Sequence, residues 1–310
     1  MIKTWSYKNE YRNFRKNILK SIDKTLKSEK IFFGKETEKF EKQFIKKNKL
    51  KYGVAVGSGT DALYISLLAL GIKKNDEVIT VSNTAIPTVS AIISCGATVR
   101  FVDIGPDYLI DVNKIEQCIS KNTKAIIPVH LFGQACNMRK ICTIAKKYKL
   151  KIIEDSADTL GATINNKSTG IYSDISITSF YGSHIISCAG NGGMFLTNDK
   201  KLYERAKVLR SWGRMSTLIK DSENINKRLD IKLNGYDYDK KFVFSEIGYN
   251  FEPSEIGASF GLVQLKKFKS FNKIRNSNFK SHYKFFKKRN ELFIIPKISK
   301  NVKTNFLAYP

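Results

Sequence analysis

Short apolar runs alternate along most of the chain with segments whose apolar residues recur at a helical period. Seven runs of strand length lie at residues 52–56, 77–81, 99–104, 125–131, 151–154, 175–180 and 193–197. Helical spacing is found in residues 60–70, 85–95, 112–119, 138–148 and 202–212. Alternation of this kind predicts an α/β protein with a mostly parallel sheet that helices cover on both faces.

The two ends of the chain differ from this central region. Residues 1–50 predict helices joined by a loop, because Phe40 and Phe44 lie four residues apart on one helical face. Residues 215–239 are polar and predict a loop, and a further helix is expected from Pro253.

We expect two domains. A large domain over residues 1–235 would contain the sheet, and residues 236–310 would begin a smaller C-terminal α/β domain. The apolar residues 306–310 predict a strand that is cut short, as in a fragment.

The chain is strongly basic, with 54 Lys and Arg against 28 Asp and Glu and a formal net charge of +26. Such a charge can mark nucleic-acid binding. The lysines are spread along the chain, however, which favours a solvated basic surface that attracts anionic substrates over a nucleic-acid partner.

Two classes of protein are disfavoured by the remaining composition. No apolar run reaches membrane-spanning length and residues 1–20 contain no apolar signal-peptide core, so we expect a cytoplasmic protein without a membrane partner. The five cysteines are scattered and form no C-x-x-C pair, which argues against a disulfide framework or a zinc site.

The loop Gly57-Ser-Gly-Thr-Asp-Ala-Leu63 joins the first predicted strand to its helix. Glycines allow close approach of the backbone to a phosphate, and a helix N-terminus offers free N–H groups to it. Loops of this composition also merely cap helices. A dinucleotide-binding G-x-G-x-x-G after a strand is absent.

A second candidate segment is Ile152-Ile-Glu-Asp-Ser-Ala-Asp-Thr-Leu-Gly161, in which an apolar strand delivers two acids at its carboxyl end. An aspartate there can hold a pyridine nitrogen protonated, which makes the ring an electron sink. Asp155 could instead cap a helix.

The third segment is Ser179-Phe-Tyr-Gly-Ser-His184, followed by Gly190-Asn-Gly-Gly193. Residues 168–199 contain no Lys or Arg, although a stretch of this length would hold about five or six by proportion. His184 is therefore the residue of this segment suited to proton transfer at neutral pH.

Together these three segments resemble the DegT/DnrJ/StrS family of sugar aminotransferases, which have fold type I and use pyridoxal phosphate (PLP). The family frame S-F-x-x-x-K, followed by G-[DE]-G-G, holds His184 in place of its lysine. Three further segments match the family pattern: Asp76-Glu-Val-Ile-Thr80, Gly96-Ala-Thr-Val-Arg-Phe-Val-Asp103 and Pro128-Val-His-Leu-Phe-Gly-Gln134.

The resemblance implies roles for individual residues. The cofactor phosphate would be bound by Gly59, Thr60, Asp61 and Ser179, and the pyridine nitrogen by Asp155. Asp158 stands where most members have a Gln near the ring hydroxyl. Asn250 would reach the phosphate in a neighbouring subunit, which makes the expected active unit a homodimer.

His184 and Asp158 resemble the branch of nucleotide-linked 4-keto-6-deoxyhexose 3-dehydratases, and so does the segment 236–250. This resemblance implies non-covalent pyridoxamine phosphate (PMP), His184 as the base, loss of the C3 hydroxyl, and regeneration of PMP from glutamate or a similar amino donor. One branch carries an iron–sulfur cluster on cysteines after Trp-Gly-Arg. No Cys follows Trp212-Gly-Arg214 here, so we expect neither a cluster nor another metal.

Two other functions remain open. A PLP-dependent nucleotide-sugar aminotransferase is favoured by Ser82-Asn-Thr84, which is similar to the 3-aminotransferases. A non-catalytic member that binds a nucleotide-sugar would also lack the lysine, although Asp155, Ser179 and Asn250 are retained. Ala85 departs from the family, in which many members stack an aromatic ring on the cofactor at this position.

Overall fold

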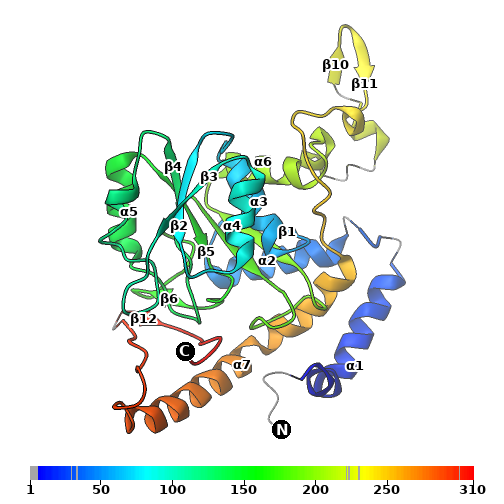
Figure 1. Ribbon diagram of the computed structural model, residues 1–310. Coiled ribbons are helices and arrows are strands. Elements are labelled where there is room, and N and C mark those ends of the chain that lie inside the picture. The colour runs from blue at the N-terminus through cyan, green and yellow to red at the C-terminus, as the bar shows by residue number, and fades with distance from the viewer. Residues whose placement is uncertain are drawn as a thin grey trace.

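The computed structural model describes residues 6–28, 30–32, 34–220, 222, 224–229, 231–299 and 301–310. Residues 1–5 of the predicted N-terminal helical segment, and Phe33, at which the family resemblance begins, lie outside them. A seven-stranded sheet forms the centre (Figure 1). Its strands are β1 (Tyr52–Val56), β2 (Glu77–Val81), β3 (Thr98–Val102), β4 (Thr123–Ile127), β5 (Lys151–Asp155), β8 (Ile175–Ser179) and β9 (Gly193–Thr197).

The strand order is β1-β9-β8-β5-β4-β2-β3, and β9 runs antiparallel to the strands on either side of it, β1 and β8. The predicted mostly parallel sheet is confirmed. Because β4, β5 and β8 are parallel, their carboxyl ends lie at one edge of the sheet, where ligands of open α/β sheets collect.

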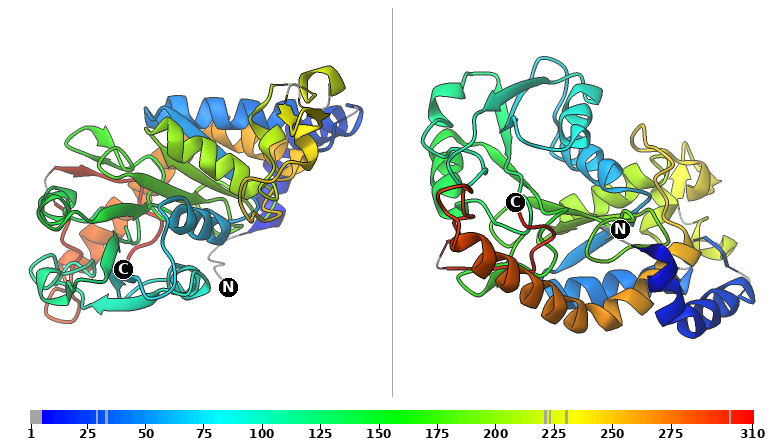
Figure 2. Two further views of the ribbon diagram at one scale, coloured as in Figure 1. Left: turned by 90° about the horizontal axis from the view of Figure 1, so that it is seen from above. Right: turned by 60° about the horizontal axis from the view of Figure 1, so that its bottom comes forward.

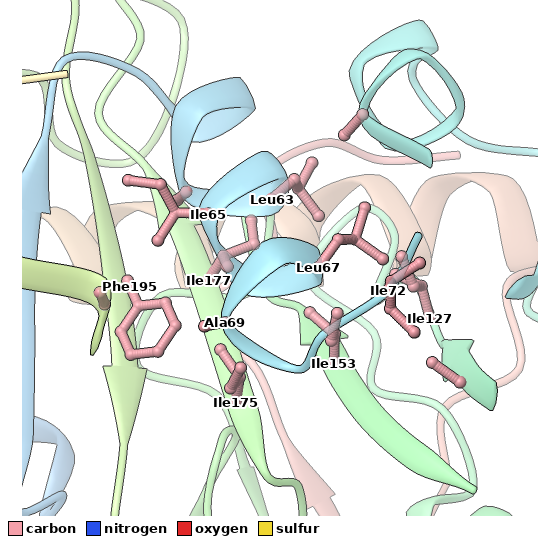
Figure 3. Packing of buried hydrophobic residues seen from close by; sticks show 14 of the residues in the cluster. Leu63, Ile65, Leu67, Ala69, Ile72, Ile127, Ile153, Ile175, Ile177 and Phe195 are labelled. Carbon is pink, nitrogen blue, oxygen red and sulfur yellow. The ribbon is translucent and has the colours of Figure 1, made fainter. Parts of the chain in front are cut away.

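One face of the sheet is covered by α3 (Gly59–Ala69), α4 (Ile86–Ser94) and α6 (Lys200–Arg210). Leu63, Ile65 and Leu67 of α3 pack on residues of the strands below, including Ile177 and Phe195 (Figure 3). Successive strand residues point to opposite faces, so Ile153 joins this cluster and Ile152 the opposite one. β5 is thus apolar on both sides, as expected for a central strand of a doubly covered sheet.

The other face is covered by α5 (Met138–Tyr148), α2 (Lys35–Asn48) and α7 (Glu255–Lys287). Phe40 and Phe44 of α2 are buried and meet Phe180 edge-on, at centroid distances of 5.0 and 5.3 Å. Their predicted position on one helical face is confirmed. Figure 2 shows α7 running beneath the sheet beside α2, with α1 (Tyr7–Leu26) against its first half.

The Glu255 side chain joins the N-termini of α2 and α7. Its carboxylate accepts hydrogen bonds from the backbone N–H groups of Gly34, Glu36 and Thr37, at 2.9–3.2 Å. These N–H groups have no partner inside α2, because the first turn of a helix leaves its donors free. The contact therefore fixes the N-termini of the two helices relative to each other.

The segment predicted to be a loop over residues 215–239 contains short 3-10 turns and the hairpin β10 (Ile231–Leu233) and β11 (Tyr236–Tyr238). The hairpin projects from the body of the molecule (Figure 1). The predicted domain boundary between residues 235 and 236 falls at its turn, and the division into two domains stays a prediction.

Two predicted elements are wrong. Residues 112–119 form turns and one 3-10 turn, Glu116–Cys118, in place of a helix. Their apolar residues pack below the sheet without helical backbone, as the fully buried Ile115 shows. Residues 306–310 are irregular, and Phe306 stacks on Phe279 of α7 at a centroid distance of 3.4 Å.

Three short strands lie at the edge of the molecule in one small sheet: β6 (Thr163–Ile164), β7 (Lys167–Ser168) and β12 (Val302–Lys303). The pairing of β12 with β6 brings the C-terminal segment back to the sheet domain. Among the described residues, no helix combines the length and apolar character needed to cross a membrane.

Candidate functional site

A cavity of about 480 Å³ opens at the carboxyl ends of β4, β5 and β8. Its walls come from the first turns of α3 and α4, from these strand ends and from the loop that joins β8 to β9. Six of the predicted site residues line it: Gly59, Thr60, Asp155, Asp158, Ser179 and His184.

The start of α3 forms one end of this cavity. The Ser58 hydroxyl caps the helix by accepting the Asp61 N–H at 3.1 Å. Gly59 lies so close to Ser179 that an added Cβ would be 2.8 Å from the Ser179 Cβ, which explains the glycine. Thr60 and Ser179 line this end of the cavity together with the helix N-terminus, a combination suited to an anion.

Asp61 lies apart from the cavity lining. Its carboxylate packs against Gly57, where an added Cβ would lie 2.9 Å from Asp61 Oδ2. Burial raises the pKa of Asp61, and the hydrogen bonds from Ser58 oppose that rise. From this position behind the loop, Asp61 can support the first turn of α3.

Asp155 ends β5 and is buried, with 5% of its surface exposed. Its Oδ2 accepts the Thr88 hydroxyl at 2.8 Å, and its Oδ1 accepts the Ala157 N–H at 3.2 Å. Burial raises the pKa of Asp155, whereas these two hydrogen bonds favour the ionised form. The two hydrogen bonds thus hold the Asp155 side chain in one orientation. The alternative role predicted for Asp155, the cap of a helix, is wrong, because no helix follows β5 directly.

Asp158 and His184 face each other across the cavity, with 3.6 Å between Asp158 Oδ1 and His184 Nδ1. This distance is too long for a hydrogen bond, and Nδ1 has no hydrogen-bond partner among the described residues. Asp158 Oδ2 accepts the Phe132 N–H at 3.2 Å. Burial raises the pKa of Asp158 to about 6.

His184 lies in the loop between β8 and β9, and its backbone N–H donates to the Tyr181 carbonyl at 3.0 Å. Burial, together with the nearby charge of Arg275, lowers the pKa of His184 to about 4. The imidazole is therefore neutral at pH 7 and has one ring nitrogen free to accept a proton.

Two side chains of the site were not singled out from the sequence. Thr88, in the first turn of α4, holds Asp155 and also contacts the Thr84 hydroxyl at 2.9 Å. His130 follows β4 and lines the cavity, and its Nδ1 accepts the Cys136 N–H at 3.2 Å. Its Nε2 therefore carries the proton and donates to Glu154 at 2.8 Å. Their positions in the sequence could have indicated them, because His130 lies at the end of a predicted strand and Thr88 near the start of a predicted helix.

Asn250 is exposed and does not line this cavity. Its backbone pairs with Ser211 in an isolated bridge at the end of the segment that carries the hairpin. The structure thus brings six of the eight predicted residues together and leaves Asp61 and Asn250 outside the cavity lining.

The described residues contain no group of three or more His, Cys, Asp or Glu placed to hold a metal ion. All five cysteines are free thiols.

The strand order, the single antiparallel strand and the cavity at the carboxyl ends are those of the fold-type I PLP-dependent transferases. Residues 12–310 match the DegT/DnrJ/EryC1/StrS aminotransferase family, and the chain belongs to this family.

Two curated relatives and one solved structure illustrate the similarity. A dTDP-3-amino-3,4,6-trideoxy-alpha-D-glucose transaminase from Micromonospora megalomicea is 38% identical over 210 residues, 67% of this chain and 56% of the relative. A GDP-perosamine synthase from Caulobacter vibrioides is 35% identical over 256 residues, 82% of this chain and 62% of the relative. The chain thus spans about three fifths of the length of these relatives.

The solved structure is an E. coli GDP-4-keto-6-deoxy-D-mannose-3-dehydratase with bound hydrated PLP. It is similar to this chain with a TM-score of 0.81 and 28% identity, covering 99% of this chain and 76% of that one.

Proposed function

We propose that the protein binds PLP or PMP without a covalent bond and catalyses the 3-dehydration of a nucleotide-linked 4-keto-6-deoxy sugar. The observation that carries this proposal is the residue at position 184. His184 lines the cavity at the place where the family frame has its lysine, and none of the described lining residues is a lysine.

The described residues fit such a cofactor. The cavity has the size of a small-molecule site. Thr60, Ser179 and the N-terminus of α3 would hold the phosphate, and the fixed Asp155 carboxylate would face the pyridine nitrogen. A cofactor bound there supplies an amine for the keto group and an electron sink.

His184 would act as the general base. Because burial lowers its pKa to about 4, the imidazole is unprotonated at neutral pH and so has a lone pair available to take the proton. Asp158, whose pKa is about 6, is then ionised and lies 3.6 Å from Nδ1, so it stabilises the imidazolium that forms. His184 can return this proton to the departing C3 hydroxyl, which leaves as water.

We propose a homodimer as the active unit, with glutamate or a similar amino donor as second substrate. Two observations support the homodimer: Asn250 lies outside the cavity of its own chain, and the same segment exposes Phe242 and Ile247, at 66% and 89% of their surface. Mixing Asp155→Asn chains with Asn250→Ala chains should restore activity, since one site of each heterodimer is intact. No restoration would place Asn250 in its own chain's site.

Borohydride treatment tests the absence of a covalent bond. With PLP present, the mass of the wild-type chain should not change, whereas His184→Lys should gain a pyridoxyl group. A pyridoxyl adduct on one lysine of the wild type would contradict the proposal.

Amino transfer is the second candidate, because the transaminase named above is 38% identical over two thirds of the chain. The product mass separates the two reactions. With PLP, glutamate and a panel of nucleotide-linked 4-keto-6-deoxy sugars, dehydration yields a 3-deoxy sugar that keeps its keto group, and amino transfer yields an amino sugar.

A further inference from the structure

A second cavity, of about 520 Å³, lies between α1, α7 and the loop that carries His184. Ser183 and His184 line both this cavity and the first one. His184 therefore forms part of the boundary between the two. The two cavities thus adjoin at these two residues, beside the group that would act on the substrate.

The charged residue that distinguishes the second cavity is Arg275 of α7. Its Nη1 donates to the backbone carbonyls of Phe306 and Leu307, at 3.4 and 3.0 Å. Among the described residues it has no carboxylate within ion-pairing distance, whereas Arg205 has one such partner and Arg210 has two. Its Nε and Nη2 donate to no described group.

An arginine in this situation is suited to an anion. Burial lowers the pKa of Arg275, as expected for a cation partly withdrawn from water without a counter-charge. The planar guanidinium has a fork of donors that matches a carboxylate or a phosphate in two parallel hydrogen bonds.

The rest of the lining is compatible with an anion. Ser270 and Asn278 supply neutral polar groups, and the rings of Phe14 and Phe271 meet edge-on at 5.9 Å. The one acid of the lining, Glu10, is hydrogen-bonded to the amide of Gln264, and burial raises its pKa.

We propose that this second cavity binds an anionic group of the substrate, a phosphate or a carboxylate, with the Arg275 guanidinium as its counter-charge. Its contact with His184 gives the site a function, because an anchored remote group holds the reacting carbon beside the base. The assignment of the anion to a substrate rests on the proposed function.

The test uses His184 as a reporter and needs neither cofactor nor turnover. The chain has three histidines, and the His184 signal in an NMR spectrum is identified by its loss in His184→Asn. The pKa of His184 is then measured while inorganic pyrophosphate or glutarate is added. An anion at Arg275 neutralises the positive charge that disfavours the imidazolium, so the pKa should rise and saturate.

Three variants make the result specific. Arg275→Gln should raise the pKa of His184 without any anion and weaken anion binding by about tenfold or more, the typical effect of losing a charged hydrogen-bond donor. Arg275→Lys should keep part of the response. Lys273→Gln removes an exposed charge from the same helix and should behave as wild type. Thermal unfolding checks that each variant is folded.

A response to pyrophosphate identifies the diphosphate of a nucleotide-sugar as the anion, and a response to glutarate identifies the amino donor. Pyrophosphate bound at the first turn of α3 would act equally on wild type and Arg275→Gln. Equal responses of these two proteins, or no response to either anion, would overturn the proposal. If the proposed dehydration is wrong, the response of the His184 pKa to anions should still be seen. Failure of the proposed function and failure of the anion site are therefore distinguishable.

Discussion

The two walls of the cofactor cavity are built differently. On one wall, Asp155 ends a central strand, and its backbone N–H and carbonyl bond to Pro128 and His130 on the neighbouring chain segment, each at 3.0 Å. On the other wall, His184 lies in a loop, and its Nδ1 has no hydrogen-bond partner. The first wall holds a carboxyl group in a fixed orientation, and the second leaves a nitrogen free.

This difference matches the two tasks of the proposed reaction. A carboxylate that pairs with a ring nitrogen must keep one charge and one orientation throughout. A general base must gain and lose a proton, so a permanent hydrogen-bond partner on its reactive nitrogen would hinder it. The following changes test whether the two walls have these separate roles.

The largest effect is expected for Asp155→Asn. The amide keeps the shape of the side chain but cannot stabilise a pyridinium charge, so turnover should be abolished while the fold is retained. Product formation and circular dichroism measure the two outcomes. Near-normal turnover would show that the fixed wall does not hold the ring nitrogen.

His184→Asn should leave cofactor binding intact and stop proton removal. Loss of a general base typically slows a reaction by about 10²–10⁴-fold. Exchange of the cofactor methylene proton with deuterated solvent, followed by NMR, reports this step directly. Exchange at the wild-type rate would place the base elsewhere and remove the main support for dehydration.

The features that could be predicted from the sequence are those that depend on residues close together in the chain. The strand 151–154 was predicted to within one residue, because its apolar positions and terminal acids are local features. Residues 112–119 were misread because Ile115 and Ile119 have helical spacing, yet their burial arises from a turn packed below the sheet.

Contacts between residues far apart in the chain could not be predicted from the sequence. Thr88 and Asp155 are 67 residues apart, and nothing in either segment specifies their hydrogen bond. Likewise, only the packing of α7 under the sheet brings Arg275 near His184. The family resemblance implied that Asp155, Ser179 and His184 share one site, but the sequence did not reveal which neighbouring groups shift the pKa values of Asp155 and His184.

Thr88→Val should have a smaller effect, because it removes one of two hydrogen bonds that hold the Asp155 carboxylate. A hydrogen bond to a charged group contributes about 1.5–3 kcal/mol, so a loss of about 10–100-fold in turnover is expected. The pH dependence of the absorbance of the bound cofactor should shift in Thr88→Val and recover in Thr88→Ser. An unchanged absorbance profile would show that Thr88 does not act through Asp155.

The smallest effect is expected when pH changes the protonation of Asp158, which faces His184. The pH dependence compares these two groups. The charges near His184 are the Asp158 carboxylate at 3.6 Å and the Arg275 guanidinium, and the Tyr181 ring lies edge-on to it. As pH falls through about 6, Asp158 takes up a proton and no longer stabilises the imidazolium, so the exchange rate should fall severalfold. As pH falls further through about 4, His184 itself becomes protonated and exchange should stop.

Asp158→Asn should remove the first step and keep the second, with circular dichroism confirming the fold at each pH. A single step near pH 6.5, the ordinary pKa of histidine, would show that the base is not desolvated by its loop, and the contrast between the two walls would fail.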